Sequence, residues 1–122
     1  MAWDLNSERP IYAQIIEKVM FDIVSGHYKP GEKLPSVRDL ASEASVNPNT
    51  MQKALSELEN SGLVYSQRTS GRFITEDNSM IQNAQKELAK AEITQFMQKM
   101  DNLGLTREET IALIQSGKEK TT

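Results

Sequence analysis

The sequence predicts a mainly helical α+β fold, in which three helices and a β-hairpin form a head and two further helices form a short tail. Apolar residues recur at helical spacing in separate segments of the chain. Two short β-prone runs flank a polar tip that contains glycine. The composition changes at the polar joint Glu76–Ser79, which divides a predicted head domain, residues 1–76, from a predicted tail, residues 77–122.

Length and composition limit the class of protein. The chain has 122 residues, of which 38% are hydrophobic and 25% charged, as expected for one small folded domain with an appendage. No apolar run approaches the roughly 18 residues of a membrane span, and no signal peptide is predicted. The chain has no cysteine, which excludes disulfides and thiolate metal sites. We therefore expect a cytoplasmic protein that binds no membrane.

Catalytic and metal-binding patterns are missing from the sequence. His27 is the single histidine and lies beside Gly26 in a predicted turn, so it has no sequence partner for a metal site or an acid–base pair. Gly-rich phosphate loops and the HExxH motif do not occur. We expect no enzyme activity, no cofactor and no metal ion.

The first helix is predicted from Pro10 to about Ser25. Apolar residues recur there as one stripe: Ile11, Ile15, Val19 and Ile23. Proline suits the first helical position, where its missing N–H costs nothing. Gly26 ends the helix, and Lys29–Glu32 is predicted to turn, with proline at the second turn position and glycine at the third.

The second helix begins after Ser36, which resembles a capping box with Asp39 three residues later. Its inner face is predicted to be apolar: Val37, Leu40, Ala41 and Ala44. A tight link, Ser45–Val46, leads to the next helix.

The third helix has Asn47 as its N-cap and Pro48 at its first position. It runs to about Asn60 and stops at Gly62, through the left-handed conformation that glycine adopts freely. Its buried side is predicted to comprise Met51, Ala54, Leu55 and Leu58.

The β-prone runs are Leu63–Tyr65 and Arg72–Thr75, around the polar tip Gln67–Gly71. Two strands joined in this way form a hairpin. Three helices followed by a hairpin constitute a winged helix-turn-helix, in which the hairpin is the wing.

The tail is predicted to contain a long helix from Met80 to Asn102, a break at Leu103–Leu105, and a last helix that a capping box, Thr106–Glu109, opens and Gly117 ends. The long helix spans roughly 30 Å, more than the head can cover. Its apolar stripe either folds back on the first helix or pairs with a second chain, and we expect pairing. The predicted dimer interface comprises Ile81, Leu88, Ile93, Phe96, Met97, Met100, Leu103, Ile111 and Ile114.

Two helices joined by a tight turn fit a helix-turn-helix, whose second helix enters the major groove of DNA. Amide and lysine side chains on the third helix would contact base edges. The predicted base contacts are Asn47, Asn49, Thr50, Gln52 and Lys53. The alternative is that these groups are merely the solvated side of an amphipathic helix.

Two further segments are predicted to contact the DNA backbone. Ser36 and Arg38, near the start of the second helix, would anchor phosphates. The wing tip suits backbone or minor-groove contact, through Arg68, Thr69, Gly71 and Arg72. A solvated arginine and a plain hairpin loop are the alternatives.

The net charge argues against DNA binding, because it is −3 for the chain. Residues 1–76 carry eight Lys and Arg against ten Asp and Glu, a net charge of −2. Salt screens charges beyond roughly 8–10 Å, so an acidic protein binds DNA if its cations converge on one face. The cations that must converge are Arg38, Lys53, Arg68 and Arg72.

The order of these motifs resembles the DNA-binding domain of GntR-family regulators. The similarity covers residues 10–75, and its most specific stretch is PGEKLPSVRDLA, residues 30–41. The short two-helix tail is similar to that of the YtrA-type subfamily. The other branches that we considered append a large ligand-binding or an aminotransferase-like domain, for which the tail has no room.

The resemblance implies DNA contact by Arg38, by the recognition-helix residues Asn47, Asn49, Thr50 and Gln52, and by the wing around Gly71. Many family members carry arginine where this chain has Pro48 and Gln52, so the operator sequence does not transfer. The family also implies control of the protein's own operon or of a transporter operon.

We therefore expect a homodimeric repressor that binds near-palindromic double-stranded DNA. The sequence leaves open whether a small-molecule effector binds the tail. The alternative function is a winged-helix module that docks a protein partner and never touches DNA.

Overall fold

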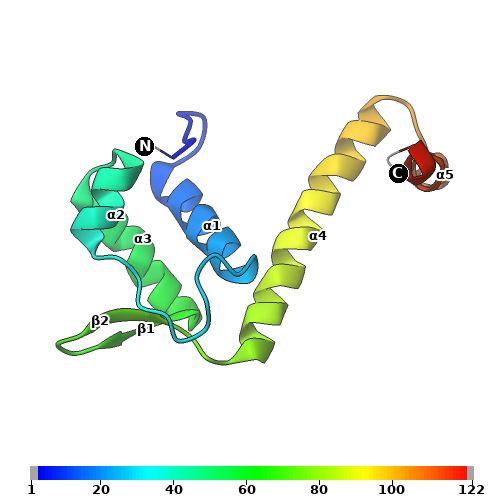
Figure 1. The fold of residues 1–122 in the computed structure, drawn as a ribbon. Helices are drawn as coiled ribbons and strands as arrows, with labels where there is room; N and C mark the ends of the chain where they lie inside the picture. Colours follow the sequence, from blue (N-terminus) through cyan, green and yellow to red (C-terminus); the bar gives the residue numbers. More distant parts are fainter. Residues whose placement is uncertain (1–2, 121–122) are drawn as a thin grey trace. The chain divides into compact units, whose positions relative to one another are not determined.

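The computed structural model describes the backbone of residues 3–120 and the side chains of residues 3–117, and it confirms a mainly helical α+β fold (Figure 1). The elements are α1 (Ile11–Val24), α2 (Val37–Ala44), α3 (Pro48–Ser61), β1 (Val64–Gln67), β2 (Gly71–Ile74), α4 (Asn78–Asn102) and α5 (Arg107–Lys120). The chain forms two compact units that divide within α4, between Gln85 and Lys86. Among the described helices, none combines the length and the apolar character needed to cross a bilayer.

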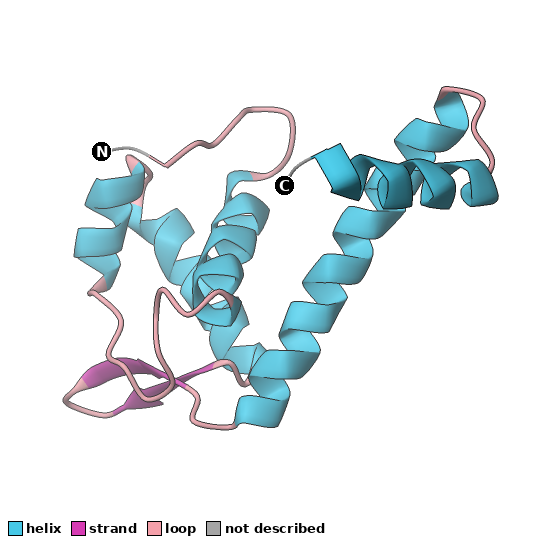
Figure 2. Cartoon of the chain, turned by 45° about the vertical axis from the view of Figure 1, so that its right-hand side comes forward, coloured by secondary structure: helices cyan, strands magenta, loops and turns pink. Residues whose placement is uncertain are grey.

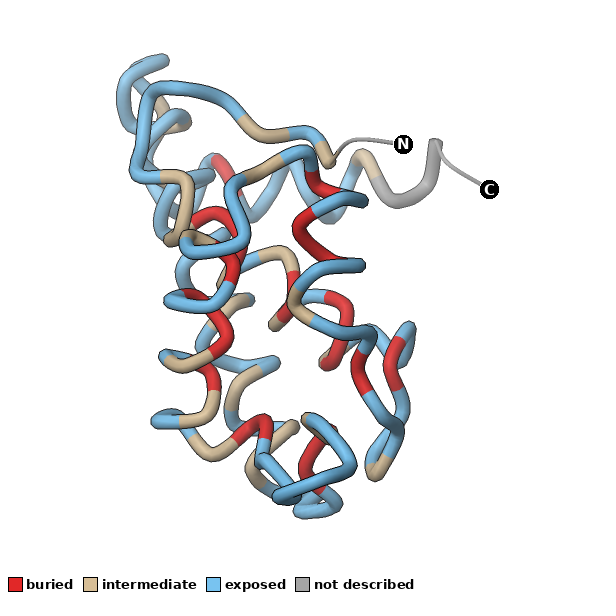
Figure 3. The backbone as a smooth tube through the Cα atoms, turned by 90° about the vertical axis from the view of Figure 1, so that its left-hand side faces the viewer, coloured by how far each residue is buried: buried red, intermediate tan, exposed pale blue. Residues whose placement is uncertain are grey.

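The core of the head lies between α1, α2 and α3, where the buried segments of the backbone face inward (Figure 3). Ile15 and Val19 of α1 and Leu40 of α2 are almost fully buried. All four residues predicted for the inner side of α3 are buried: Met51, Ala54, Leu55 and Leu58. The helical periodicity of the sequence therefore identified the correct face of α3.

Local capping signals define the first turn of α2 and the last turn of α3 as predicted. The Ser36 hydroxyl accepts a hydrogen bond of 3.1 Å from the backbone N–H of Asp39, and Gly62 closes α3 with a φ of +89°. Pro10 was expected to be the first helical residue, but it is the N-cap of α1, because its ψ of 133° is extended. Its carbonyl accepts the 3.4 Å hydrogen bond from Gln14 that opens the helix.

The wing is an antiparallel hairpin, in which Val64 pairs with Ile74 and Gln67 with Gly71 (Figure 2). Its strands therefore begin and end slightly off the predicted bounds. The segment 31–34 lies along the other edge of β2, with a 2.9 Å bond from Gly31 N–H to the Ile74 carbonyl. The pairing of this segment was not predicted from the sequence. The turn before it was predicted, and a 3.0 Å bond from Glu32 N–H to the Lys29 carbonyl confirms that turn.

The first turns of α4 still belong to the head, because Met80, Ile81 and Ala84 pack against its core. A left-handed Gly104, with a φ of +90°, breaks the chain between α4 and α5 as predicted. Thr106 and Glu109 form both bonds of the capping box, 2.9 and 3.1 Å long.

The prediction that Gly117 ends the last helix is wrong. The helix α5 continues through Gly117 to Lys120. Gly117 does not have the positive φ that ends a helix at glycine, so the helical backbone simply continues there.

Candidate nucleic-acid interface

The outer face of α3 is polar and exposed. Asn49, Gln52 and Lys53 are exposed there, opposite the four buried apolar residues, while Thr50 is half-buried. The Asn47 side chain, at the N-cap, accepts a 2.7 Å hydrogen bond from the backbone N–H of Asn49. The amide of Gln52 donates to the Ser56 hydroxyl over 3.3 Å. The helix thus presents hydrogen-bonding groups along one side.

Lys53 is held by an aromatic ring of another helix. Its Nζ lies 4.3 Å from the centroid of the Tyr12 ring, which is half-buried on α1. A cation over an aromatic face is attracted by the ring quadrupole. These two residues, with Ile11, Asn49 and Thr50, line a cleft of about 420 Å³. The ring of Tyr12 therefore restricts the directions that the Lys53 ammonium takes.

A second cleft, of about 800 Å³, lies between the wing and the start of α2. The wing contributes residues 66–72, and the other wall is formed by residues 33–37 together with Asp39. Five of the predicted DNA contacts line this cleft: Ser36, Arg68, Thr69, Gly71 and Arg72. The fold thus brings together two segments that lie about thirty residues apart in the sequence.

Arg38 does not line either cleft, although its side chain is exposed at the start of α2. Within residues 3–117, Arg38 and Arg68 form no ion pair. Both guanidinium groups therefore retain all their N–H donors for an external acceptor such as phosphate.

Arg72 has a partner inside the protein. Its Nε donates to the carboxylate of Glu59 near the end of α3, and only 18% of the Arg72 side chain is exposed. The Ser66 hydroxyl donates to the same carboxylate oxygen over 2.8 Å. Burial raises the pKa of Glu59, but the hydrogen bonds from Ser66 and Arg72 outweigh this effect and hold the pKa below its usual value. Arg72 therefore ties the wing to α3.

Gly71 allows the wing to approach the segment before α2. Its φ is +108°, and a Cβ there would lie 3.0 Å from the Cε atom of Lys33. Lys33 is thus a cation at the wing cleft that the sequence analysis did not select. Lys33 lies at the cleft because the segment 31–34 pairs with β2, and no local sequence pattern predicted this pairing.

The comparisons with known proteins agree with this geometry. Residues 11–74 match the family model described as bacterial regulatory proteins, gntR family. The chain is 39% identical over 100 residues to the HTH-type transcriptional repressor YtrA of Bacillus subtilis, which covers 82% of this chain and 72% of that protein.

Two solved structures are similar. A GntR family transcriptional regulator from Listeria monocytogenes has a TM-score of 0.83 and 38% identity, over 92% of this chain and 98% of that one. The DNA-binding domain of AraR in complex with operator ORE1 has a TM-score of 0.53 and 32% identity, over 62% of this chain and 94% of that one. The chain therefore belongs to the GntR family of bacterial regulatory proteins, as a DNA-binding transcription regulator of the YtrA type.

Proposed function

We propose that this chain is a repressor that binds a near-palindromic operator as a homodimer in the cytoplasm. The observation that carries the proposal is the wing cleft, which joins Ser36 and Lys33 of one segment to Arg68 of another. The similar YtrA of Bacillus subtilis is named a transcriptional repressor, and the similar AraR domain is bound to an operator. Control of the protein's own operon or of a transporter operon is part of the same proposal.

In this proposal, α3 is the recognition helix and lies in the major groove. Asn49 and Gln52 have amides that match the bidentate pattern of adenine, and Thr50 offers a hydroxyl or methyl contact. Asn47 stands at the helix N-terminus, where the partial positive charge of the helix favours phosphate. Lys53, placed by Tyr12, contacts guanine or a phosphate.

Phosphate contacts would come from Ser36, Arg38 and the wing. Arg68 and Thr69 lie at the wing tip, and Gly71 lets the backbone approach closely. Arg72 keeps guanidinium N–H groups beyond the Nε that binds Glu59, and these would donate hydrogen bonds to phosphate from a fixed position, although Glu59 offsets the charge of Arg72. Because the chain carries a net charge of −3, the cations that line the wing cleft, Lys33, Arg68 and Arg72, would have to supply much of the attraction to DNA.

The tail, residues 77–122, is proposed to pair two copies. Large apolar side chains of residues 86–117 are exposed to an extent that suggests association: Ile93 57%, Phe96 41%, Leu103 71%, Ile111 41%, Leu113 56% and Ile114 54%. Leu88, Met97 and Met100 are half-buried and extend this surface. Ile81, which we had also assigned to the interface, packs against the head core.

Pairing would place two recognition helices on successive turns of the major groove, roughly 34 Å apart. Binding at the second half-site then becomes intramolecular, which raises the overall affinity without new contacts. A two-fold symmetric protein reads a palindromic site for this geometric reason.

Selection of bound fragments from random DNA, followed by gel-shift titration, tests the proposal. We expect a near-palindromic site with half-sites one helical turn apart. Arg38→Ala should weaken binding to all sequences and reduce the salt slope by about 1.8, because each protomer of the proposed dimer loses one phosphate contact. Gln52→Ala should instead relax the preference at one base pair, by about 1–3 kcal/mol.

Lys29→Ala is the control for Arg38→Ala, since it removes the same charge from an exposed turn that lies outside both clefts. An unchanged titration of Arg38→Ala at about 0.15 M salt would contradict the phosphate role. If wild-type binding to random duplex did not change with salt, the protein would be a protein-docking module instead.

A further inference from the structure

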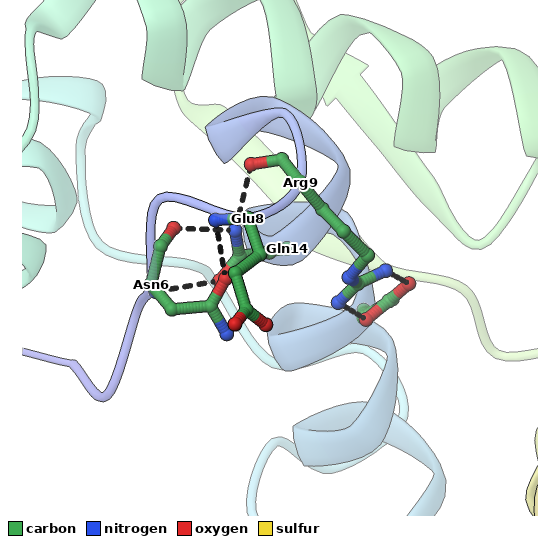
Figure 4. Close-up of polar contacts among 5 residues, drawn as sticks. Asn6, Glu8, Arg9 and Gln14 are labelled. Atoms are coloured by element: carbon green, nitrogen blue, oxygen red, sulfur yellow. Dashed lines mark hydrogen bonds and ion pairs between the residues drawn. The ribbon is translucent and has the colours of Figure 1, made fainter.

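The segment before α1 is bound to the head by hydrogen bonds at Trp3, Asn6 and Arg9. We call residues 3–9 the N-terminal strap. Gln14 of α1 is buried, with 6% of its surface exposed, and its amide bonds only to the strap. Its Oε1 accepts from Asn6 N–H over 3.0 Å, and its Nε2 donates to the carbonyls of Asn6 and Arg9 over 2.8 and 3.0 Å (Figure 4).

An ion pair fixes the end of the strap that adjoins α1. Arg9 donates two hydrogen bonds of 2.8 Å to the carboxylate of Glu17, as the dashed lines in Figure 4 show. The hydrogen bond from Arg9 lowers the pKa of Glu17 below its usual value. The backbone N–H of Glu8 donates to the Asn6 side chain over 3.0 Å, which closes a turn within the strap.

The other end of the strap reaches the helix-turn-helix. The indole Nε1 of Trp3 donates a 2.9 Å hydrogen bond to the carboxylate of Glu43 on α2. The half-buried Trp3 ring packs against the head core, and the Nζ of Lys18 lies 5.7 Å from the ring centroid. The strap therefore connects α1, through Gln14, to α2, through Trp3.

The strap also borders the N-terminal end of the recognition helix. Residues 44–47 and Thr50 form one wall of a cleft of about 420 Å³, and Trp3, Leu5 and Ile11 form the other. Asn47 and Thr50 are two of the proposed DNA contacts. The family match begins at residue 11, so the strap lies outside the part of the chain that the family describes.

The helix α2 is short, and the bond from Trp3 adds a contact at its exposed side to those of its buried residues Leu40, Ala41 and Ala44. It has eight residues, and a helix of this length is not stable without tertiary contacts. It ends at Ser45, whose left-handed φ of 59° is unusual for a residue other than glycine. The Trp3–Glu43 bond therefore lies next to the turn from which α3 starts, which backbone hydrogen bonds from Ser45 and Val46 to α2 close.

We propose that the strap positions the recognition helix, and that Trp3 and Glu43 are positioning residues for sequence readout. The proposal rests on the proposed function, in which α3 reads the operator. Base contacts need hydrogen-bond geometry, whereas phosphate contacts tolerate small displacements. Loss of the Trp3–Glu43 bond should therefore reduce binding to the operator more than binding to random duplex.

Two variants of one residue separate this role from the charge of Glu43. Glu43→Gln and Glu43→Leu both remove the negative charge, but only glutamine keeps an oxygen that accepts from the Trp3 indole. We expect Glu43→Leu to lower the ratio of operator to random-duplex affinity about three- to tenfold. Glu43→Gln should keep that ratio within about twofold of wild type.

Trp3 is the single tryptophan, so its fluorescence reports on the strap directly. The emission of Glu43→Leu should shift to the red, toward that of a solvated indole, and the emission of Glu43→Gln should not. A second variant, Trp3→Phe, keeps a ring but removes the N–H donor. It should lower the affinity ratio as Glu43→Leu does, and the two changes together should lower it no further.

The outcomes distinguish this proposal from the proposed function. A wild-type protein that prefers no sequence over random duplex overturns the proposed function and the positioning role with it. A wild-type protein that selects an operator, with equal affinity ratios and equal emission for Glu43→Gln and Glu43→Leu, overturns the positioning role alone. Urea unfolding of each variant, followed by far-UV circular dichroism, identifies any loss of affinity that comes from an unfolded head.

Discussion

The head and the tail of this regulator differ in whether their apolar side chains are buried. The buried apolar residues all come from the head, between Ile15 and Ile74. Among the described side chains of residues 86–117, Thr110 alone is buried, and large apolar side chains such as Leu103 are exposed. The same helical periodicity in the sequence therefore produces a complete core in one region and a surface that lacks a partner in the other.

The difference follows from how many elements share each apolar face. In the head, α3 packs against α1, α2 and β1, so the apolar faces of these elements share one core. The helix α4 has 25 residues, and none of its side chains is buried within the chain. We infer that the head folds by itself, while the tail would complete its packing in the proposed dimer.

The largest expected effect is the loss of head stability when a buried side chain is truncated. Leu55, on α3, is fully buried, so Leu55→Ala should lower the free energy of unfolding by about 2–5 kcal/mol, because it leaves a cavity. Leu103→Ala removes the same atoms from a side chain that is 71% exposed, and should change the unfolding of the head by less than about 0.5 kcal/mol. Urea unfolding followed by far-UV circular dichroism and by Trp3 fluorescence measures these losses, since Trp3 packs against the head core. Equal losses would show that the tail is part of the same core.

The next effect concerns the exposed face of the tail. Phe96→Asp should convert the proposed dimer to a monomer in sedimentation equilibrium and lower operator affinity on the order of 100-fold, because a charge in the proposed apolar interface would be costly. Gln95→Asp is the control, since it adds the same charge at an exposed polar position of the same helix. If Phe96→Asp lowered the stability of the head without changing the molecular mass, the tail would be covering the head instead of pairing.

A smaller effect compares two arginines of the wing. Arg72→Ala should lower the free energy of unfolding by about 1–2 kcal/mol, because it leaves Glu59 without its charged partner. Arg68→Ala, at the exposed wing tip, should cost less than about 0.5 kcal/mol but reduce the salt slope of DNA binding by about 1.8, one phosphate contact in each protomer of the proposed dimer.

The effect of Arg72 should also depend on pH. The pKa of Glu59 is lower in the folded protein than in the unfolded chain, so its contribution to stability is present above the unfolded value, about 4.3. It is lost as the pH falls through the folded pKa. The difference between wild type and Arg72→Ala in urea unfolding should therefore shrink at acid pH. A difference that stayed constant would mean that Arg72 acts only through packing.

The smallest effects have opposite signs at two glycines. Gly117→Ala should stabilise α5 by up to about 1 kcal/mol, since Gly117 is helical and a Cβ there would have no neighbour within 4 Å. Gly62→Ala should destabilise the head by about 1–2 kcal/mol, because a φ of +89° is unfavourable for alanine. Thermal unfolding followed by far-UV circular dichroism compares them. A stabilising Gly62→Ala would contradict the left-handed cap.

Helix caps and buried helix faces could be predicted from the sequence alone, because each depends on a few neighbouring residues. The caps at Ser36, Asn47 and Gly62 and the capping box Thr106–Glu109 follow from side chains within four positions of one another. The inner face of α3 follows from a period of 3.6 residues. Gly117 shows the limit of such signals, because glycine permits the left-handed conformation without imposing it.

Hydrogen bonds between side chains far apart in the sequence could be identified only in the tertiary structure. Arg72 and Glu59 are 13 residues apart, and Trp3 and Glu43 are 40 residues apart, so no local pattern pairs them. Arg72 was predicted as a DNA contact because it is a cation beside the wing tip. The fold also places the carboxylate of Glu59 beside it. Apolar periodicity specifies which face of a helix is buried, but the partner of a side chain depends on how separate elements pack.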